Sequence, residues 1–164
     1  MSVRLVVAVV LASAMVACAV RYLSAEQAKP GAAAPRLVVV TVSDPVGEKM
    51  SYSRDIIIAK PGERIKLRLV SMGKLPRTVM THNWVLLKLG SDPKKFADAA
   101  GLSPATGYIP AGLKSQILAQ ADMVGPGEQS EVVFTAPTVP GKYPYLCTFA
   151  AHFPAGMAGT LVVK

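Results

Sequence analysis

Short apolar stretches alternate with turn-forming residues from about residue 36 to the end of the chain. Ile65, Leu67 and Leu69 alternate with other residues in the period-two pattern of a strand that buries one face. The same pattern predicts further strands at 36–43, 79–87, 131–135, 143–147 and 160–163. Pro-Gly pairs at turns separate several of these segments. Many short strands with this spacing predict an all-β, antiparallel sandwich with Greek-key connections.

Residues 90–124 interrupt the strand pattern. Pro93–Ala100 resembles a short helix in composition, and Gly and Pro recur through residues 101–112. We therefore expect a short helical flap around residues 90–124. No segment of the chain has the pattern of a Gly-rich phosphate loop or of a Ser-centred nucleophile elbow.

The N-terminal segment differs from the rest of the chain. Met1–Arg4 is short and basic, and Leu5–Val20 is apolar, which is the layout of a secretory signal peptide. The apolar run is short for a spanning helix, which needs roughly 20 apolar residues. We assign residues 1–17 to a signal peptide, 18–35 to a flexible tether rich in Ala, Gly and Pro, and 36–164 to the folded domain. A periplasmic or cell-surface location follows from this assignment.

Two ways of processing this leader remain open. Met15-Val16-Ala17-Cys18 resembles a bacterial lipobox, in which the cysteine becomes the lipidated N-terminus. Ordinary cleavage after Ala19 or Ala25 is the alternative. The first predicts a lipoprotein anchored to a membrane through Cys18, and the second predicts a protein without an anchor. In either case we expect Cys147 to be an unpaired thiol in an oxidising compartment, where it needs protection or a function.

Composition and charge restrict the function further. The 164 residues, 51% of them hydrophobic and 17% charged, suit one folded domain and exclude a disordered polymer. Two cysteines are too few for a disulfide-dense scaffold. The formal net charge is +8, but the basic residues are scattered, which argues against a nucleic-acid partner. A positive field favours acidic partners or anionic membrane surfaces instead.

Candidate chemistry is concentrated in two short segments. The chain has two histidines, His82 and His152, and the second lies between Cys147 and Met157. A thiolate, two imidazoles and a weakly bound thioether are the donor set of a blue-copper electron-transfer site. Cys147 ends one predicted strand and Thr160 opens the next, so one loop presents three donors. His82 must come from a different strand.

These segments resemble those of a known family. Residues 75–86, which include Thr81-His82-Asn83, resemble the first-histidine segment of azurin. Cys147-Thr148-Phe149 and Gly159-Thr160-Leu161 resemble its ligand loop. The resemblance extends over about residues 36–164 and implies a cupredoxin fold that binds one copper ion as Cu(I) or Cu(II). The four residues between His152 and Met157 resemble auracyanin in number, since azurin has three.

The resemblance also implies a role for each site residue. The equatorial ligands would be His82, Cys147 and His152, and the axial ligand would be Met157. A weak contact from the backbone carbonyl of Thr81 is a further expectation, although azurin has glycine there. Asn83 would hydrogen-bond around the cysteine sulfur and hold the two ligand segments together.

Four protein ligands leave no open position for a substrate, which favours a one-electron carrier over an enzyme. A copper oxidase or nitrite reductase needs further histidines, and the chain has none. A cysteine protease using Cys147 and His152 needs an orienting group and an oxyanion hole, and no motif indicates either. A copper-binding or copper-delivery protein with the same ligands remains the alternative.

The expected partner is a c-type cytochrome or another exported redox protein. By the same resemblance, His152 lies at the surface end of the site, with Leu75, Val79 and Met80 close by. The uncharged neighbours of His152 are Ala150, Ala151, Phe153, Pro154 and Ala155. Together these residues predict an exposed apolar docking patch for a small, transient interface.

Overall fold

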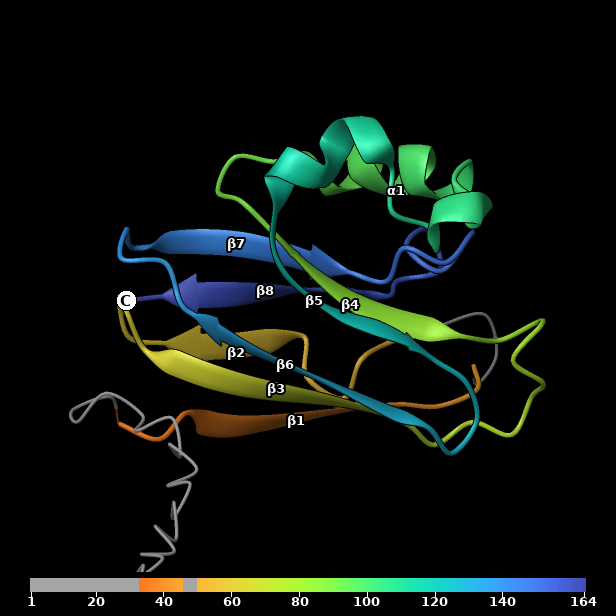
Figure 1. Cartoon of the computed structure of the whole chain (residues 1–164), viewed down its shortest axis with the longest axis horizontal. Coiled ribbons are helices and arrows are strands. Elements are labelled where there is room, and N and C mark those ends of the chain that lie inside the picture. The colour runs from red at the N-terminus through yellow and green to blue at the C-terminus, as the bar shows by residue number, and fades with distance from the viewer. Residues whose placement is uncertain (1–32, 46–49) are drawn as a thin grey trace, which may run out of the picture. The chain divides into compact units, whose positions relative to one another are not determined.

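The computed structural model describes residues 33–45 and 50–164. The predicted signal peptide at 1–17, the lipobox cysteine Cys18 and most of the tether at 18–35 lie outside the described residues. Within the described part, the strands form two sheets, with the strand orders β1-β3-β6 and β2-β8-β7-β4-β5 (Figure 1). The predicted all-β sandwich with a short helix is confirmed.

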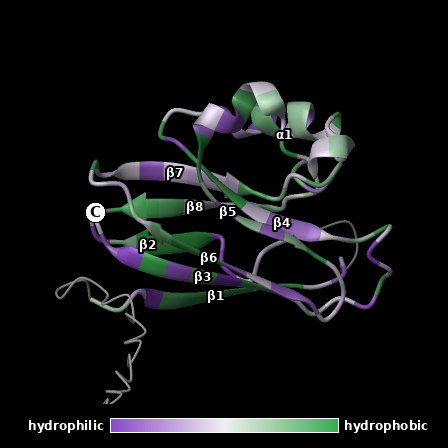
Figure 2. Ribbon diagram, in the orientation of Figure 1, coloured by the Kyte–Doolittle hydropathy of each residue, from purple (hydrophilic) through white to green (hydrophobic). Residues whose placement is uncertain are grey.

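The smaller sheet shows the predicted alternation most clearly. It contains β1 (Arg36–Val42), β3 (Arg64–Ser71) and β6 (Gln129–Thr135). Ile65, Leu67 and Leu69 of β3 are fully buried, while the residues between them are partly exposed. Figure 2 shows this as alternating hydrophobic and hydrophilic colours along β3. One buried face on each strand packs against the other sheet.

The larger sheet carries the chemistry predicted from the sequence. It contains β2 (Ile56–Ala59), β8 (Ala158–Val163), β7 (Gly141–Leu146), β4 (His82–Leu87) and β5 (Ile117–Val124). The prediction of a purely antiparallel sandwich is wrong, because β1 pairs with β3 and β2 with β8 in parallel. The chain leaves β1, forms β2 in the other sheet and returns as β3, so the neighbours β1 and β3 run in the same direction.

The flap is shorter than predicted. It consists of α1 (Pro93–Gly101) and two short 3-10 helices, Pro104–Thr106 and Ala111–Gln116. The carboxylate of Asp92 accepts hydrogen bonds from two backbone N–H groups and caps α1. Phe96 is buried in a small cluster with Val85, Leu87 and Leu146. Residues 117–124 are not part of the flap, because they pair with β4 as strand β5.

The main core lies between the sheets and contains Trp84 and Tyr145, whose ring centroids are 5.2 Å apart. Trp84 is fully buried. Gly159 of β8 lies directly against the Tyr145 ring, so any side chain at that position would collide with it. The two strands are therefore held at a separation that only glycine permits.

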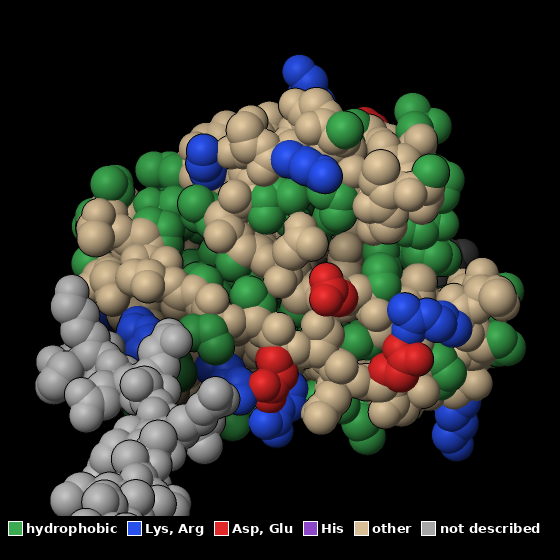
Figure 3. Space-filling model, viewed as in Figure 1, with side chains coloured by type: hydrophobic (Ala, Val, Ile, Leu, Met, Phe, Trp, Pro, Cys, Tyr) green, Lys and Arg blue, Asp and Glu red, His purple; other side chains and the backbone are tan. Residues whose placement is uncertain are grey.

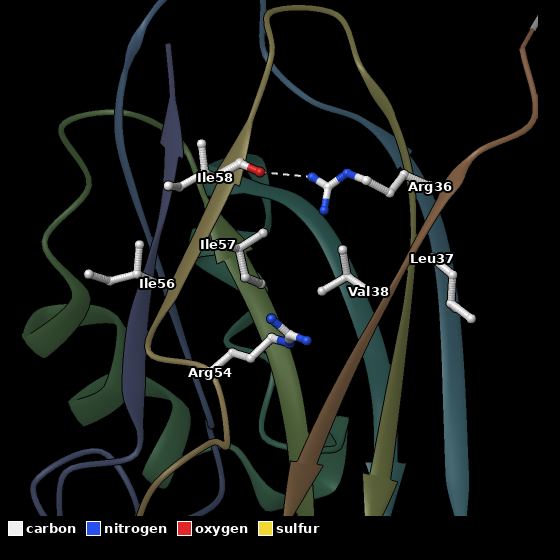
Figure 4. A pocket seen from close by; sticks show the side chains of 7 residues that line it. All are labelled: Arg36, Leu37, Val38, Arg54, Ile56, Ile57 and Ile58. Atoms are coloured by element: carbon white, nitrogen blue, oxygen red, sulfur yellow. Dashed lines mark hydrogen bonds between the residues drawn. The ribbon is translucent and has the colours of Figure 1, made fainter.

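β1 and β2 are edge strands of the two sheets, and they lie on either side of a gap between the sheet edges. A cavity of about 290 Å³ lies between them, lined in part by Val38 and Ile57. Arg36 of β1 donates a hydrogen bond of 2.8 Å to the carbonyl of Ile58 in β2, which Figure 4 shows as a dashed line. Arg54 donates in the opposite direction, from Nε to the carbonyl of Val39 at 3.0 Å. The two arginines thus satisfy backbone acceptors that the sheet edges leave unpaired.

Candidate metal centre

The predicted donor residues meet at one end of the larger sheet. His82 is the first residue of β4, and Cys147 follows directly after the last residue of β7. Since β4 and β7 are antiparallel neighbours, the start of one lies beside the end of the other. The loop from Cys147 to Met157 therefore lies at the same end of the sandwich as the loop that leads into His82 (Figure 1).

Strand β4 begins later than predicted. Residues 79–81 do not form strand, because Val79 and Met80 turn back and donate backbone hydrogen bonds to the carbonyl of Pro76. The register of β4 against β5 shifts between His82 and Trp84. Every residue of β4 is buried, including the consecutive His82 and Asn83. Irregular pairing of this kind re-aims side chains near functional sites.

The distances join the four donors into one cluster. Nδ1 of His82 lies 3.2 Å from the sulfur of Met157, and Nδ1 of His152 lies 3.5 Å from the sulfur of Cys147. The two imidazole ring centroids are 4.9 Å apart. One potential ligand atom each from His82, Cys147 and His152 lies within 4.8 Å of the others. Both histidines therefore present Nδ1 toward the sulfur atoms.

Backbone hydrogen bonds within the loop bring Cys147 and Met157 together. The N–H of Cys147 donates to the carbonyl of Met157 at 3.1 Å, and the N–H of Met157 donates to the carbonyl of His152 at 3.0 Å. Ala151 and Gly156 both adopt positive φ angles, of 67° and 103°. Positive φ is strained for alanine, and this conformation closes the loop tightly.

Asn83 links the two ligand-bearing segments. Its side chain donates to Oγ1 of Thr148 at 2.7 Å and accepts from the backbone N–H of Thr148 at 2.8 Å. Tyr52 donates from its hydroxyl to the carbonyl of Asn83 at 2.5 Å. All three residues are buried, so these hydrogen bonds are shielded from competition by water. Thr81 is likewise buried, and its hydroxyl donates to the carbonyl of Val124 at 3.0 Å.

The protonation of the site follows from its burial. Burial lowers the pKa of His82 to about 4, with Asp44 acting in the opposite direction. Burial also lowers the pKa of His152 to about 4, and the neighbouring His82 adds to that effect. Burial raises the pKa of Cys147 to about 12, although backbone hydrogen bonds from Asn83 and Phe149 oppose the shift. At neutral pH the metal-free site thus holds two neutral imidazoles and a protonated thiol.

This donor set fits one copper ion. Neutral imidazole nitrogens and sulfur donors together suit copper better than they suit hard cations such as Mg²⁺ or Ca²⁺. Nε2 of His82 has no hydrogen-bond partner among the described residues, and its Nδ1 faces the other donors. The cluster is also dry, since His152 is the most exposed of the four donors at only 4%.

The residues predicted to form a docking patch differ in exposure. Leu75 and Val79 are exposed, while Met80 is half-buried and packs against the core. Of the neighbours of His152, Ala150, Ala151 and Pro154 are exposed, and Phe153 and Ala155 are half-buried. The His152 ring is more completely covered than the sequence led us to expect, in part by Phe149, whose ring centroid is 4.7 Å away.

The sequence did not single out two residues that support the site. Tyr52 lies 31 positions before Asn83, and no local pattern connects them. Asp44 accepts a hydrogen bond of 2.7 Å from the backbone N–H of Lys74, in the loop that leads to His82. Its charge also acts on His82. An isolated acidic residue in a loop carries no sequence signal for such a contact.

Comparison with known proteins agrees with this geometry. Residues 38–164 match the model of a family described as copper binding proteins, plastocyanin/azurin family. The chain is 37% identical to auracyanin-A of Chloroflexus aurantiacus over 120 residues, which cover 72% of this chain and 70% of that protein. It is 31% identical to azurin of Achromobacter denitrificans over 117 residues, or 70% of this chain and 77% of that protein.

A solved structure shows the same architecture. The structure of auracyanin A, titled a "blue" copper protein from the green thermophilic photosynthetic bacterium Chloroflexus aurantiacus, superposes with a TM-score of 0.63. The match has 30% sequence identity and covers 78% of this chain and 99% of that one.

Proposed function

Because the chain belongs to the plastocyanin/azurin family of copper binding proteins, we propose that it is an exported mononuclear blue-copper protein that carries single electrons between redox partners. Members of this family that resemble azurin and auracyanin are electron carriers and not enzymes. The observation that carries the proposal is the convergence of two imidazole Nδ1 atoms, a thiol and a thioether at one buried point. The ion supplies a one-electron Cu(I)/Cu(II) couple when bound.

In this proposal His82, Cys147 and His152 would be the strong ligands and Met157 would be the weak one. The buried side chains keep water out, and the paired hydrogen bonds between Asn83 and Thr148 hold the two ligand segments in one arrangement. A ligand set that does not rearrange suits electron transfer, because each rearrangement would add to the activation barrier. The carbonyl of Thr81 remains a candidate for a further weak contact.

The burial of the donors supports electron transfer over copper delivery. A delivery protein must expose its metal to the ligands of an acceptor, whereas His152 is 4% exposed and the other three donors less. The two functions differ in how fast copper leaves. We expect retention of copper against a chelator over many oxidation and reduction cycles. Rapid transfer of the ion to the chelator would favour delivery.

Copper titration of the purified apoprotein tests the central proposal. We expect one equivalent of copper to produce an intense visible colour from the Cys147 thiolate, with an electron paramagnetic resonance spectrum of the oxidised ion. Zinc should bind without colour and serves as the control. A protein that stays colourless after careful loading with copper would contradict the proposal.

Export rests on the leader sequence and on the similarity to azurin and auracyanin. No helix in the described residues is long and apolar enough to cross a membrane. We propose a periplasmic or cell-surface location, with Cys18 as the site of a lipid anchor. Mass spectrometry of the native N-terminus distinguishes the outcomes, because diacylated Cys18 supports the anchor and an unmodified start at Val20 or Glu26 contradicts it.

For the partner we propose a c-type cytochrome or another exported redox protein that docks on the apolar residues around His152. Val79→Lys should slow electron transfer to such a partner, because it places a charge in an interface that must exclude water. Val139→Lys is the matched control, since both valines are 58% exposed and Val139 lies just before the start of β7, the end of that strand opposite Cys147. Equal transfer rates in the two variants would place the docking surface elsewhere.

A further inference from the structure

Basic side chains gather at the end of the sandwich opposite the metal centre. We call this group the basic pole. Its members are Arg36, Lys60, Arg64, Lys88, Lys142 and Lys164, and all six are exposed. Figure 3 shows the Lys and Arg side chains of one face of the molecule, which lie toward both the left and the right end in that view.

The strand register places these residues together. Arg36 and Arg64 are the first residues of the parallel neighbours β1 and β3. Lys60 follows β2 and Lys164 follows β8, and the backbone N–H of Lys164 donates to Ala59. These positions lie at the ends of their strands that are far from His82 and Cys147.

The remaining two members lie on the central strands of the larger sheet. Lys142 is the second residue of β7, a strand that ends next to Cys147. Lys88 follows the last residue of β4, a strand that begins at His82. Both strands thus run between the metal centre at one end and a lysine at the other.

Few negative charges balance the basic pole. Glu63, the acidic side chain that lies beside these residues, pairs with Arg36. Asp92, the next acid after Lys88, is occupied as the cap of α1. The loops at the metal end differ, because there Arg77 pairs with Glu128 and Asp44 lies beside Lys74.

We propose that the basic pole is a docking surface for the anionic phospholipid headgroups of a membrane. Two observations favour the anionic surface of a membrane over a small soluble anion. The described domain begins at residue 33, close to Arg36, so the predicted tether, which starts at the proposed lipid site Cys18, enters the domain at this pole. The basic residues are also spread over the ends of both sheets, with Arg36 and Arg64 on the smaller sheet and the four lysines on the larger one, which suits a broad layer of phosphates better than one small anion.

Docking at this end directs the metal centre away from the membrane and toward soluble partners. The inference goes beyond the proposed function and does not depend on copper. A protein that failed to bind copper would still have the basic pole, and the vesicle experiment below would still test it.

Sedimentation with vesicles tests the proposal. The chain from Val20 onward, which lacks both the leader and the proposed lipid site, is mixed with vesicles of phosphatidylglycerol and phosphatidylcholine, and with vesicles of phosphatidylcholine alone. We expect binding to the anionic vesicles that weakens as salt is added. The triple variant Lys60→Gln, Lys142→Gln, Lys164→Gln should lose about fivefold in partition coefficient for each lysine, equivalent to about 1 kcal/mol each.

The control is a second triple variant with an equal change in charge, Lys74→Gln, Arg77→Gln, Lys95→Gln, whose residues are exposed and are not members of the basic pole. We expect it to retain most of the vesicle binding. An equal loss in both triple variants would overturn the proposal, because net charge alone would then explain binding. Binding of the basic pole to an acidic protein or to nucleic acid, without binding to anionic vesicles, would overturn it as well.

Discussion

The two ends of the sandwich use side chains in opposite ways. At the metal end, four donors are buried, and two of them are uncharged imidazoles. Ligand atoms of His82, Cys147 and His152 lie within 4.8 Å of one another, and the Met157 sulfur lies 3.2 Å from Nδ1 of His82. At the basic pole, six charged side chains are exposed to water. The loss of a single contact to a buried polar atom costs much stability, because water cannot replace the lost partner. Each exposed charge makes a small and nearly additive contribution to binding, because water and salt screen it.

The largest expected effect is at Cys147. Cys147→Ser replaces the thiolate that supplies both the strongest bond and the colour. Copper affinity should fall by roughly 100-fold or more, beyond the range typical of changes to groups that only support a ligand. Visible spectroscopy and competition with a chelator measure both losses. A serine variant that stayed intensely coloured would show that Cys147 is not a ligand.

Asn83 is expected to have the next largest effect. Asn83→Ala leaves the buried N–H and hydroxyl of Thr148 without their partner, so the ligand loop loosens. Copper affinity should fall by about 10- to 100-fold, and unfolding should become easier by about 1–3 kcal/mol.

A double-mutant cycle with Thr148→Val distinguishes loss of the interaction between Asn83 and Thr148 from general destabilisation of the protein. If the two residues act through each other, the double variant should be less impaired than the sum of the single variants. Strictly additive losses would assign Asn83 a role that does not involve Thr148.

Copper affinity should depend on pH by about tenfold per unit near neutrality. The pKa of the Cys147 thiol is about 12 in the metal-free site, so binding must release its proton. The pKa values of His82 and His152 are about 4, so protons do not compete with the metal for the imidazole nitrogens above about pH 5. Affinity therefore rises with pH, and below about pH 4 it should fall more steeply. Titration calorimetry in two buffers counts the released proton, and release of none would contradict the assignment.

A smaller effect is expected at Met157. Met157→Leu should retain copper and raise the reduction potential, because a weak axial thioether tunes the couple more than it holds the ion. Met72→Leu provides the control, since Met72 is 64% exposed while Met157 is buried. Voltammetry measures the potential of each. Loss of copper from Met157→Leu alone would mean that the thioether is a principal ligand.

The smallest effect is expected at the basic pole. A single Lys142→Gln change should leave copper affinity unaltered and shift the free energy of unfolding by no more than about 0.5 kcal/mol. Copper titration and chemical denaturation measure the two quantities. A large change in affinity would show that the two ends are coupled through β7, and the comparison drawn above would fail.

Much of the fold was predictable because its signals are local. The alternation of Ile65, Leu67 and Leu69 predicted β3, and Pro93–Ala100 predicted α1. Strand β5 was missed, because its inward residues Ala119 and Ala121 are small and alanine has a low preference for strands. The short strand β2 was missed as well, since four residues give little pattern to detect.

The sequence by itself determined which atoms the site can offer, because the chain contains two histidines and both lie near other candidate donors. It also determined that Cys147, His152 and Met157 share one loop, since spacing along a chain is local. Only the tertiary structure decided that Nδ1 of each histidine faces a sulfur atom, that Tyr52 supports Asn83, and that the lysines gather at one end. Those facts depend on strand register and pairing between segments far apart in the chain, and no pattern within a single segment specifies either.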